Sequence, residues 1–472
     1  MKTRFFTVVA ILTALLGTGA MWLAGQQGRI EGTIVGRREK PAIAIIDFRG
    51  TGAAQPLMNT FNETLWDDIE ESGVFNMIAK TLYPLEPPQQ PQDFQPPRMS
   101  VPAKAGDPPV QIRVGPWLTD WSGPPVNTTY LAFGYVAAQG QDLVLNGYLF
   151  NVLQPDTQTA LVLGKRYFGT VDEAGARKVA HDFAREILSL MGVPSLAGSK
   201  IFFVSDRTGS KEIWSMDYDG SNQKQLTSYK TTSWMPGVSP DGRQVAFVTM
   251  ANNGRGEEWQ IRIHAADSGR RLTFVGPTGS SIVGPEYSPD GKKLWFAAEQ
   301  DGWPQIMNSN ADGGQLQRVS RLQAIEISPR LNPKTGTELL FISGRSGKPQ
   351  LWRMNVNGTG QEMLTTGEGD VANPAWSPSG QQVTFAWTRG YEPGNFNIFV
   401  MDLTNTKQYV QLTRDSGRNE NPWWAPDGLH LVFARQQGRV TQLYSMLADG
   451  TRVKKLTSTG NNTQPVWSKG IN

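Results

Sequence analysis

SPDGRQVAFVT, residues 239–249, is the clearest of several related stretches that recur in the C-terminal part of the chain. A proline-containing corner leads directly into an apolar strand, and a near copy, SPDGKKLWFAA, begins at Ser288. The acid of the corner could bind a metal ion or could be only a turn residue. Three of the six corners carry it, at Asp241, Asp290 and Asp427, whereas the others have Lys334, Ser379 and Lys469. Because the corner occurs without the acid, the sequence favours a turn in which Asp bonds its own backbone and Gly is left-handed.

The six corners belong to repeating units, spaced 43 to 49 residues apart. Each unit has an apolar strand, a second strand, a short polar segment ending in QLT or a variant, and a proline-containing inner strand before the corner. The apolar strands are IFFVS at 201, VAFVT at 245, LWFAA at 294, LLFIS at 339, VTFAW at 383 and LVFAR at 431. Four strands in about 45 residues are typical of a propeller blade.

Ring closure follows from the two ends of the repeat. The first unit lacks a preceding inner strand, while the last inner strand, QPVW at 464–467, has no blade after it. We therefore expect the C-terminal strand to complete the first blade, which removes the open edges. The predicted fold class is mixed: an N-terminal α/β domain followed by an all-β six-bladed propeller closed by the C-terminal strand.

The composition agrees with many short strands joined by tight turns. Gly and Pro supply 50 and 31 of the 472 residues, and charged residues make up 18%, below the usual quarter. The net charge of +3 provides no basic field of the kind that nucleic-acid-binding proteins carry, so no nucleic-acid partner is expected. The absence of cysteine excludes disulfides, thiol catalysis and cysteine-ligated zinc.

The first 20 residues are typical of a secretory signal peptide. Lys2 and Arg4 precede an apolar run over residues 5–16, and small residues follow up to Ala20. The run of about 12 residues is shorter than the roughly 20 that span a bilayer, so we expect cleavage rather than a retained anchor. Cleavage at Ala20 would leave residues 21–40 as the mature N-terminal segment, and Ala24 is the alternative site.

Residues 41–196 are predicted to form the α/β domain. PAIAIIDF at 41–48 is typical of a buried strand. The next segment carries apolar residues at 57, 61, 65 and 69, which predicts an amphipathic helix ending before Gly73. Two strands around the turn 139–141, a strand at 161–169 and a helix at 173–191 follow.

Two stretches of this domain invite other interpretations. Gly50 and Gly52 resemble the start of a dinucleotide-binding motif, but Gln55 stands where the third small residue should be, which disfavours nucleotide binding. The proline-rich stretch 84–109 is expected to be a loop or extended linker inside this domain.

The polar residues do not form a recognisable catalytic set. His181, His264 and His430 fall in separate units, and His181 diverges from its helix neighbour Asp182. The acids at 67, 68, 70 and 71 are expected on a solvated helix face. We therefore predict no catalytic residue, no metal site and no cofactor. A peptidase-like protein with a propeller, and a propeller that binds a ligand or a cation in its channel, remain as alternatives.

Several stretches resemble the TolB family, the periplasmic propeller proteins of the Tol–Pal system. They are PAIAIIDF, EESGVFNMIAKTLYP, AHDFAREIL and, above all, KIFFVSDRTGSKEIWSMDYDGSNQKQLT. The resemblance covers nearly the whole chain in the same order and implies a non-enzymatic periplasmic scaffold whose propeller spans 197–472. It also implies the peptidoglycan-associated lipoprotein and TolA as partners, a monomer outside the complex, and membrane contact only through partners. The implied role is to maintain outer-membrane integrity and to support envelope constriction in cell division.

The resemblance further places the lipoprotein at one mouth of the propeller and assigns the mature N-terminus a part in binding TolA. The mouth is expected to consist of the loops entering each inner strand, with exposed partner-binding residues just before each proline. These residues are Trp234, Met235, Val283, Gly284, Ile327, Ser328, Ala372, Asn373, Glu420, Asn421, Thr463 and Gln464.

Overall fold

A computed structural model describes residues 40–99, 111–252, 257–276, 278–279, 282–404, 408–414 and 416–469. The chain divides into two compact units, one centred on residues 40–199 and one on residues 200–468, and each is described by itself. The predicted signal peptide and almost all of the segment 21–40 lie outside the described residues.

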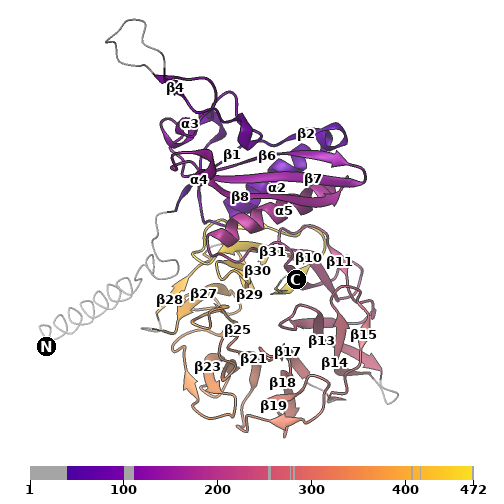
Figure 1. The fold of residues 1–472 in the computed structure, drawn as a ribbon. Coiled ribbons are helices and arrows are strands. Elements are labelled where there is room, and N and C mark those ends of the chain that lie inside the picture. The colour runs from indigo at the N-terminus through magenta and orange to yellow at the C-terminus, as the bar shows by residue number, and fades with distance from the viewer. Residues whose placement is uncertain are drawn as a thin grey trace, which may run out of the picture. The chain divides into compact units, whose positions relative to one another are not determined.

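The first unit is built on a mixed sheet in the order β3-β1-β6-β7-β8, with β2 also paired to β6 (Figure 1). Its strands are β1 (Ala42–Ile45), β2 (Arg49–Thr51), β3 (Asn76–Met77), β6 (Tyr130–Gln139), β7 (Asp142–Asn151) and β8 (Leu161–Thr170). β1 is parallel to β3 and β6, whereas β6, β7 and β8 form an antiparallel meander. The predicted strands and the turn at 139–141 are confirmed.

Two helices, α2 (Met58–Glu71) and α5 (Glu173–Leu190), pack on one face of this sheet. The predicted apolar stripe of α2 is buried: Phe61, Leu65 and Ile69 are 0% exposed. α5 begins at Asp172, whose carboxylate accepts from the Gly175 N–H at 2.7 Å and caps the helix.

One acid of α2 differs from the prediction of a solvated face. Asp68 Oδ2 lies 2.7 Å from His181 Nδ1 of α5, and the Asp68 side chain is 8% exposed. The sequence could not reveal this pair, because it joins two helices 113 residues apart. His181 is therefore a packing histidine that links α2 to α5.

The opposite face of the sheet is covered by irregular chain. Phe94 and Trp121 pack there against Phe133 and Phe150. The short elements of this unit are η2 (Lys80–Leu82), η3 (Pro91–Asp93), β4 (Arg98–Met99), β5 (Gln111–Ile112), α3 (Thr119–Ser122) and α4 (Thr157–Ala160), whereas η1 (Gly52–Leu57) leads into α2 and buries Ala54 on the helix face. Of the stretch 84–109, the structure describes residues 84–99, which are loop apart from the short elements η3 and β4, and β4 pairs with β5.

The second unit is a six-bladed propeller, and Figure 1 shows its sheets arranged in a ring. The inner strands are β33 (Asn462–Trp467), β12 (Ser233–Val238), β17 (Ile282–Tyr287), β21 (Glu326–Leu331), β25 (Val371–Trp376) and β29 (Arg418–Trp424). The second strands are β9 (Lys200–Ser205), β13 (Gln244–Asn252), β18 (Lys293–Gln300), β22 (Glu338–Ser343), β26 (Gln382–Trp387) and β30 (His430–Gln437).

The third strands are β10 (Glu212–Asp217), β14 (Glu257–Ala265), β19 (Trp303–Asn310), β23 (Gln350–Asn355), β27 (Asn397–Asp402) and β31 (Val440–Leu447). The outer strands are β11 (Lys224–Gln225), β15 (Arg271–Leu272), β20 (Gln317–Arg318), β24 (Glu362–Met363), β28 (Tyr409–Gln411) and β32 (Lys454–Lys455), and β16 (Thr278–Gly279) also pairs with β14.

The ring closes as the sequence predicts. β33, near the C-terminus, pairs with β9 of the first blade, with Trp467 opposite Ile201 and Thr463 opposite Val204. Each second strand places a phenylalanine at the same position in the blade, and all six rings are fully buried. They are Phe203, Phe247, Phe296, Phe341, Phe385 and Phe433.

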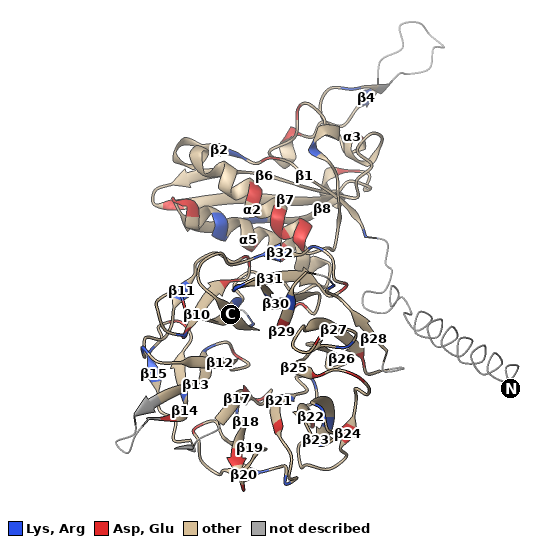
Figure 2. Cartoon of the chain, turned by 180° about the vertical axis from the view of Figure 1, so that it is seen from behind, with Lys and Arg blue, Asp and Glu red and all other residues tan. Residues whose placement is uncertain are grey.

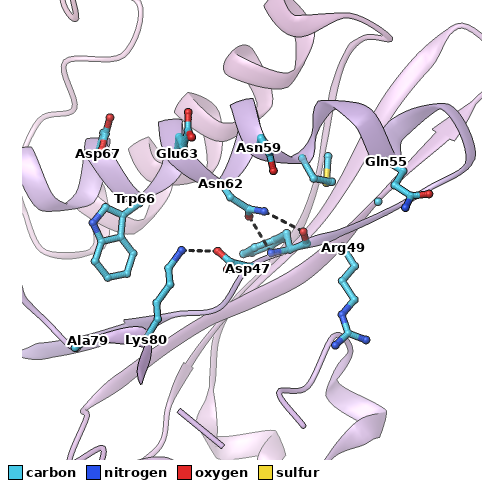
Figure 3. A pocket seen from close by; sticks show the side chains of 13 residues that line it. Asp47, Arg49, Gln55, Asn59, Asn62, Glu63, Trp66, Asp67, Ala79 and Lys80 are labelled. Atoms are coloured by element: carbon cyan, nitrogen blue, oxygen red, sulfur yellow. Dashed lines mark hydrogen bonds and ion pairs between the residues drawn. The ribbon is translucent and has the colours of Figure 1, made fainter. Parts of the chain in front are cut away.

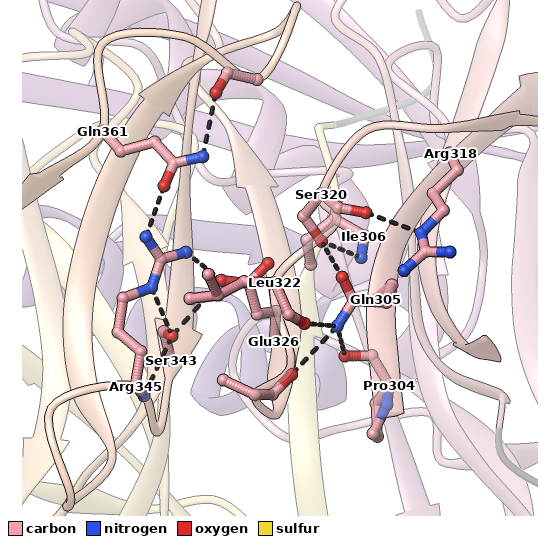
Figure 4. Close-up of polar contacts among 12 residues, drawn as sticks. Pro304, Gln305, Ile306, Arg318, Ser320, Leu322, Glu326, Ser343, Arg345 and Gln361 are labelled. Carbon is pink, nitrogen blue, oxygen red and sulfur yellow. Dashed lines mark hydrogen bonds and ion pairs between the residues drawn. The ribbon is translucent and has the colours of Figure 1, made fainter. Parts of the chain in front are cut away.

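The hydroxyl of the recurring QLT segment explains why this segment repeats. In blade 3, the Ile306 N–H donates to Ser320 Oγ at 2.9 Å, and Ser320 Oγ donates to Gln305 Oε1 at 3.2 Å (Figure 4). Four other blades contain the same pair of bonds, made by Thr227, Thr365, Thr413 and Thr457. The hydroxyl thereby ties the segment after the outer strand to the start of the third strand.

The corners are turns. Asp241 Oδ1 accepts from the Ser239 hydroxyl at 2.6 Å and from the Arg243 N–H at 3.0 Å, and Gly242 has φ +72°. The Ser239 hydroxyl and, to a lesser degree, the backbone donor hold the pKa of Asp241 below its usual value. These bonds confirm that the corner acid has a turn role.

Charges of both signs are scattered over the blades (Figure 2). Within the ranges given above, no helix has both the length and the apolar character needed to cross a bilayer.

Candidate functional site

The prolines of the six inner strands mark a bulge in each strand. In every blade the pairing register with the second strand shifts at the proline, as between Trp234 and Gly237 in β12. The residue before each proline is left-handed: Met235, Gly284, Ser328, Asn373, Asn421 and Gln464 have φ between +52° and +64°. Proline donates no hydrogen bond, so an interrupted ladder accommodates it. The prediction that these residues lie in loops entering the strands is therefore wrong.

The six left-handed residues converge on the axis of the ring. They line a common cavity of about 60 Å³ together with Arg330, Trp423 and Val466. Bonds between neighbouring blades connect them: the Met235 N–H donates to Gln464 Oε1 at 2.8 Å, and the Asn421 N–H approaches Asn373 Oδ1 at 3.4 Å. The structure thus brings one half of the predicted partner-binding set together.

A charged group beside the cavity was not predicted. Arg330 Nη1 lies 2.9 Å from Glu286 Oε2, and the guanidinium stacks 4.8 Å from the Trp423 ring. Burial raises the pKa of Glu286, and the charge of Arg330 opposes this shift. Glu286, Arg330 and Trp423 each follow the proline of their strand, directly after the shift in register.

The other half of the predicted set lies beside the axis cavity. Trp234 stacks on Trp259 at 5.2 Å, and Val283 and Ile327 pack into the cores between blades. Glu420 is held by Arg418 at 2.7 Å, with 26% of its side chain exposed. Ala372 and Thr463 are half-buried. The expectation that these residues are exposed is wrong, since no residue of the set is.

The exposed part of the mouth lies several residues further upstream. Each blade is antiparallel, so the loops that lead into the inner strands share one end of the ring with the hairpins between second and third strands. We call this end the loop end. Leu322 and Ile325, in the loop 319–325, are 44% and 48% exposed there. Gln305 Nε2 fixes this loop by donating to the Leu322 and Ala324 carbonyls (Figure 4).

The first unit contains a larger pocket, of about 760 Å³, between α2 and the chain around 47–50 (Figure 3). Lys80 forms an ion pair with Asp47 and lies 4.8 Å from the centre of the Trp66 ring. Asn62 bonds both backbone groups of Phe48, at 2.8 and 3.1 Å. Many of the polar groups that line the pocket are therefore bonded to one another.

The glycines of the dinucleotide-like motif have a packing explanation. A Cβ at Gly50 would lie 2.8 Å from the backbone of Ala54 and Gln55, so the close approach of the turn requires glycine. Gly52 has φ +58° where η1 begins. Both features serve the sharp turn into α2.

The remaining histidines take part in local packing. His430 Nδ1 lies 2.6 Å from Asp427 Oδ2, and His264 Nε2 lies 2.9 Å from the Tyr229 hydroxyl. Burial lowers the pKa of His264. A search of the described ranges finds no group of three or more His, Asp or Glu side chains placed to hold a metal ion.

Comparisons with known proteins agree with this architecture. The family model described as TolB beta propeller domain matches residues 188–373 and 359–471. Protein TolB homolog of Chlorobium luteolum is 36% identical over 205 residues, which cover 42% of this chain and 44% of that protein. Tol-Pal system protein TolB of Anaeromyxobacter dehalogenans is 32% identical over 160 residues, which cover 34% of this chain and 36% of that protein. The chain therefore matches less than half of the length of these relatives.

A solved structure extends the likeness to both units. The crystal structure of TolB from Acinetobacter baumannii has a TM-score of 0.72 at 22% identity, with 91% of this chain and 97% of that chain covered. At this identity the likeness concerns the fold.

Proposed function

The chain belongs to the TolB β-propeller family, and from this premise we propose that it is a non-enzymatic scaffold of the Tol–Pal envelope system. One relative carries the name of that system. The scaffold works in the periplasm, in keeping with the signal peptide expected at residues 1–20. Its role is to maintain outer-membrane integrity and to support envelope constriction during division.

The proposed partners are the peptidoglycan-associated lipoprotein, at the propeller, and TolA, through the mature N-terminal segment. The observation that carries the proposal for the propeller is the size of the axis cavity. At about 60 Å³ it is far smaller than the roughly 300–1,000 Å³ of sites that enclose small molecules. We propose that the partner docks across the loop end of the ring and reaches the axis only with single side chains.

The six left-handed residues favour this mode of binding. Their backbone positions are fixed by the bulges and by bonds between neighbouring blades, so the docking surface is preorganised and little ordering accompanies binding. Glu420 is the acid at the edge of this surface, and Arg418 already orients its carboxylate.

A pair of charge reversals tests the proposal. The soluble domain of the lipoprotein encoded in the same genome is titrated into the purified chain and into Glu420→Arg and Glu362→Arg. Glu362 is the matched control, because Arg353 holds it at 2.8 Å on the outer strand β24, away from the axis. We expect at least tenfold weaker binding for Glu420→Arg and unchanged binding for Glu362→Arg.

Two results would count against the scaffold. The first is no detectable binding by the unaltered chain, and the second is equal binding by both variants. The same variants, introduced in place of the chromosomal gene, should differ in envelope integrity, measured as sensitivity to detergent, with only Glu420→Arg sensitised.

A further inference from the structure

The sheet of the first unit ends in a long edge strand. β8 (Leu161–Thr170) has ten residues and follows β7 at one end of the strand order (Figure 1). Among the described residues β8 pairs with β7 alone, so its other edge is not covered by a strand. A free edge of this length presents a row of backbone donors and acceptors that another chain can extend.

The outward direction of these groups follows from one bond. The Phe168 carbonyl accepts from Lys178 Nζ at 3.1 Å, which shows that it points away from β7. In an antiparallel pair, alternate residues direct both their N–H and C=O to the same edge. Gly164 and Arg166 therefore direct their backbone groups to the same free edge as Phe168, whereas a register shift against β7 interrupts the alternation at Val162.

The side chains of β8 suit a partner strand as well. Leu161, Val162 and Phe168 are 46%, 38% and 53% exposed, and the strand contains no proline. Edge strands are usually short, or are interrupted by bulges and prolines. β8 is long and has no proline, and although its register against β7 shifts once, at Val162, it leaves apolar side chains exposed at both of its ends.

The charged side chains of β8 indicate which kind of strand can pair with its free edge. Lys165 Nζ lies 2.6 Å from Glu186 Oε1, whereas Arg166 Nε donates to the neutral Asn146 Oδ1 at 3.1 Å. These two cations occupy the middle of the strand. Antiparallel pairing with a second copy of β8 would set cations opposite cations, which is unfavourable. An acidic strand would meet them with opposite charge.

We propose that β8 is a docking edge that takes one extended, acidic segment of a partner polypeptide as an additional strand. Because side chains of a strand alternate between the two faces of a sheet, the segment places its carboxylates on the face of Arg166 and its apolar residues on the opposite face, beside Leu163 and Tyr167. This interaction surface lies in the first unit and does not depend on the propeller mouth or on the function proposed for it.

Two synthetic peptides test the proposal with the purified full chain. The first is a ten-residue peptide of alternating Val and Glu. The second has the same sequence with every other backbone nitrogen methylated on the edge that would face β8. We expect saturable binding of the first peptide, measured by fluorescence anisotropy, and at least tenfold weaker binding of the second. Hydrogen exchange should show new protection within 161–170.

Variants of the chain identify the edge independently. Gly164→Pro removes one outward N–H that β7 does not use, so binding should fall while the circular dichroism spectrum is kept. Arg166→Glu should weaken binding of the Val/Glu peptide at least tenfold and permit binding of a Val/Lys peptide. Arg98→Glu, on β4, is the matched control, because Arg98 is exposed outside this sheet, and it should bind like the unaltered chain.

The proposal is overturned by any of three results. These are equal binding of the methylated peptide, protection confined to segments other than β8, and protection of β8 in a dimer that forms without peptide. The last result would make a second copy the occupant.

Discussion

Ser328 shows that the residue before the proline, at the axis of the ring, adopts a left-handed backbone conformation. Its φ of +57° is strained for any residue with a branched Cβ and free for glycine. We predict that Ser328→Val lowers the free energy of unfolding by about 1–3 kcal/mol, whereas Ser328→Gly changes it little. Urea denaturation of both variants measures the difference, and equal losses would show that the backbone conformation is not the cause.

The corner acid gives a prediction that depends on pH. The pKa of Asp241 is lowered in the folded chain. The contribution of its carboxylate to the free energy of unfolding is therefore present above the pKa of the unfolded chain, about 3.8. It disappears as the pH falls through the lower pKa of the folded chain. Asp241→Ala should cost at most about 1 kcal/mol at pH 7, because water competes at this turn.

Urea denaturation of the unaltered chain and Asp241→Ala at pH 7 and near pH 3 measures this difference. The difference in free energy of unfolding between the two proteins should be smaller at the lower pH. A gap that grows on acidification would contradict the turn role.

At this scale, the sequence predicted residues whose role is local. The corner acids have a role that depends on their chain neighbours, whereas the packing role of Gly50 and the bulges at the six prolines were not predicted. The pairs Asp68–His181 and Glu286–Arg330 join residues 113 and 44 positions apart. No spacing rule of helices or strands connects such residues, so the sequence could not reveal them.

Within one blade, the hydroxyl after the outer strand acts as a clamp between elements. Thr365 Oγ1 accepts from the Leu351 N–H and donates to Gln350 Oε1, both at 2.9 Å and both buried. We predict that Thr365→Val destabilises the propeller by about 1–3 kcal/mol, since it leaves a buried N–H without a partner. Thr365→Ser keeps the hydroxyl and should destabilise the propeller less.

Thermal unfolding followed by calorimetry compares the two variants. If Thr365→Ser were as damaging as Thr365→Val, the packing of the methyl group rather than the hydrogen bond would be responsible.

The elements themselves were predictable because each carries its own period. The apolar stripe of α2 and the alternation of apolar and polar residues in β6 and β7 can be seen in short stretches of consecutive residues. The strand pattern of one blade recurs in the next five. The bulge was missed because its cause lies partly in the neighbouring strand. A proline followed by one variable residue and one apolar or aromatic residue fits a loop as well as a bulge, and only the pairing partner distinguishes them.

Closure by β33 is a property of the whole ring. β33 places Val466 and Trp467, 4% and 5% exposed, against the first blade. Deleting residues 462–472 removes both side chains and opens the inner edge of β9, so we predict a loss of more than about 3 kcal/mol in the free energy of unfolding together with broader unfolding. Calorimetry of the truncated chain measures this, and unchanged, sharp unfolding would contradict closure by this strand.

At the scale of the whole molecule, we assign partner binding to the loop end of the ring. Hydrogen exchange of the full chain, free and saturated with the soluble domain of the peptidoglycan-associated lipoprotein, tests this assignment most directly. We predict new protection in the loops 319–325, 364–370 and 456–461 and no change at the corners 239–243 and 288–292. Protection confined to the corners, or none at saturation, would contradict it.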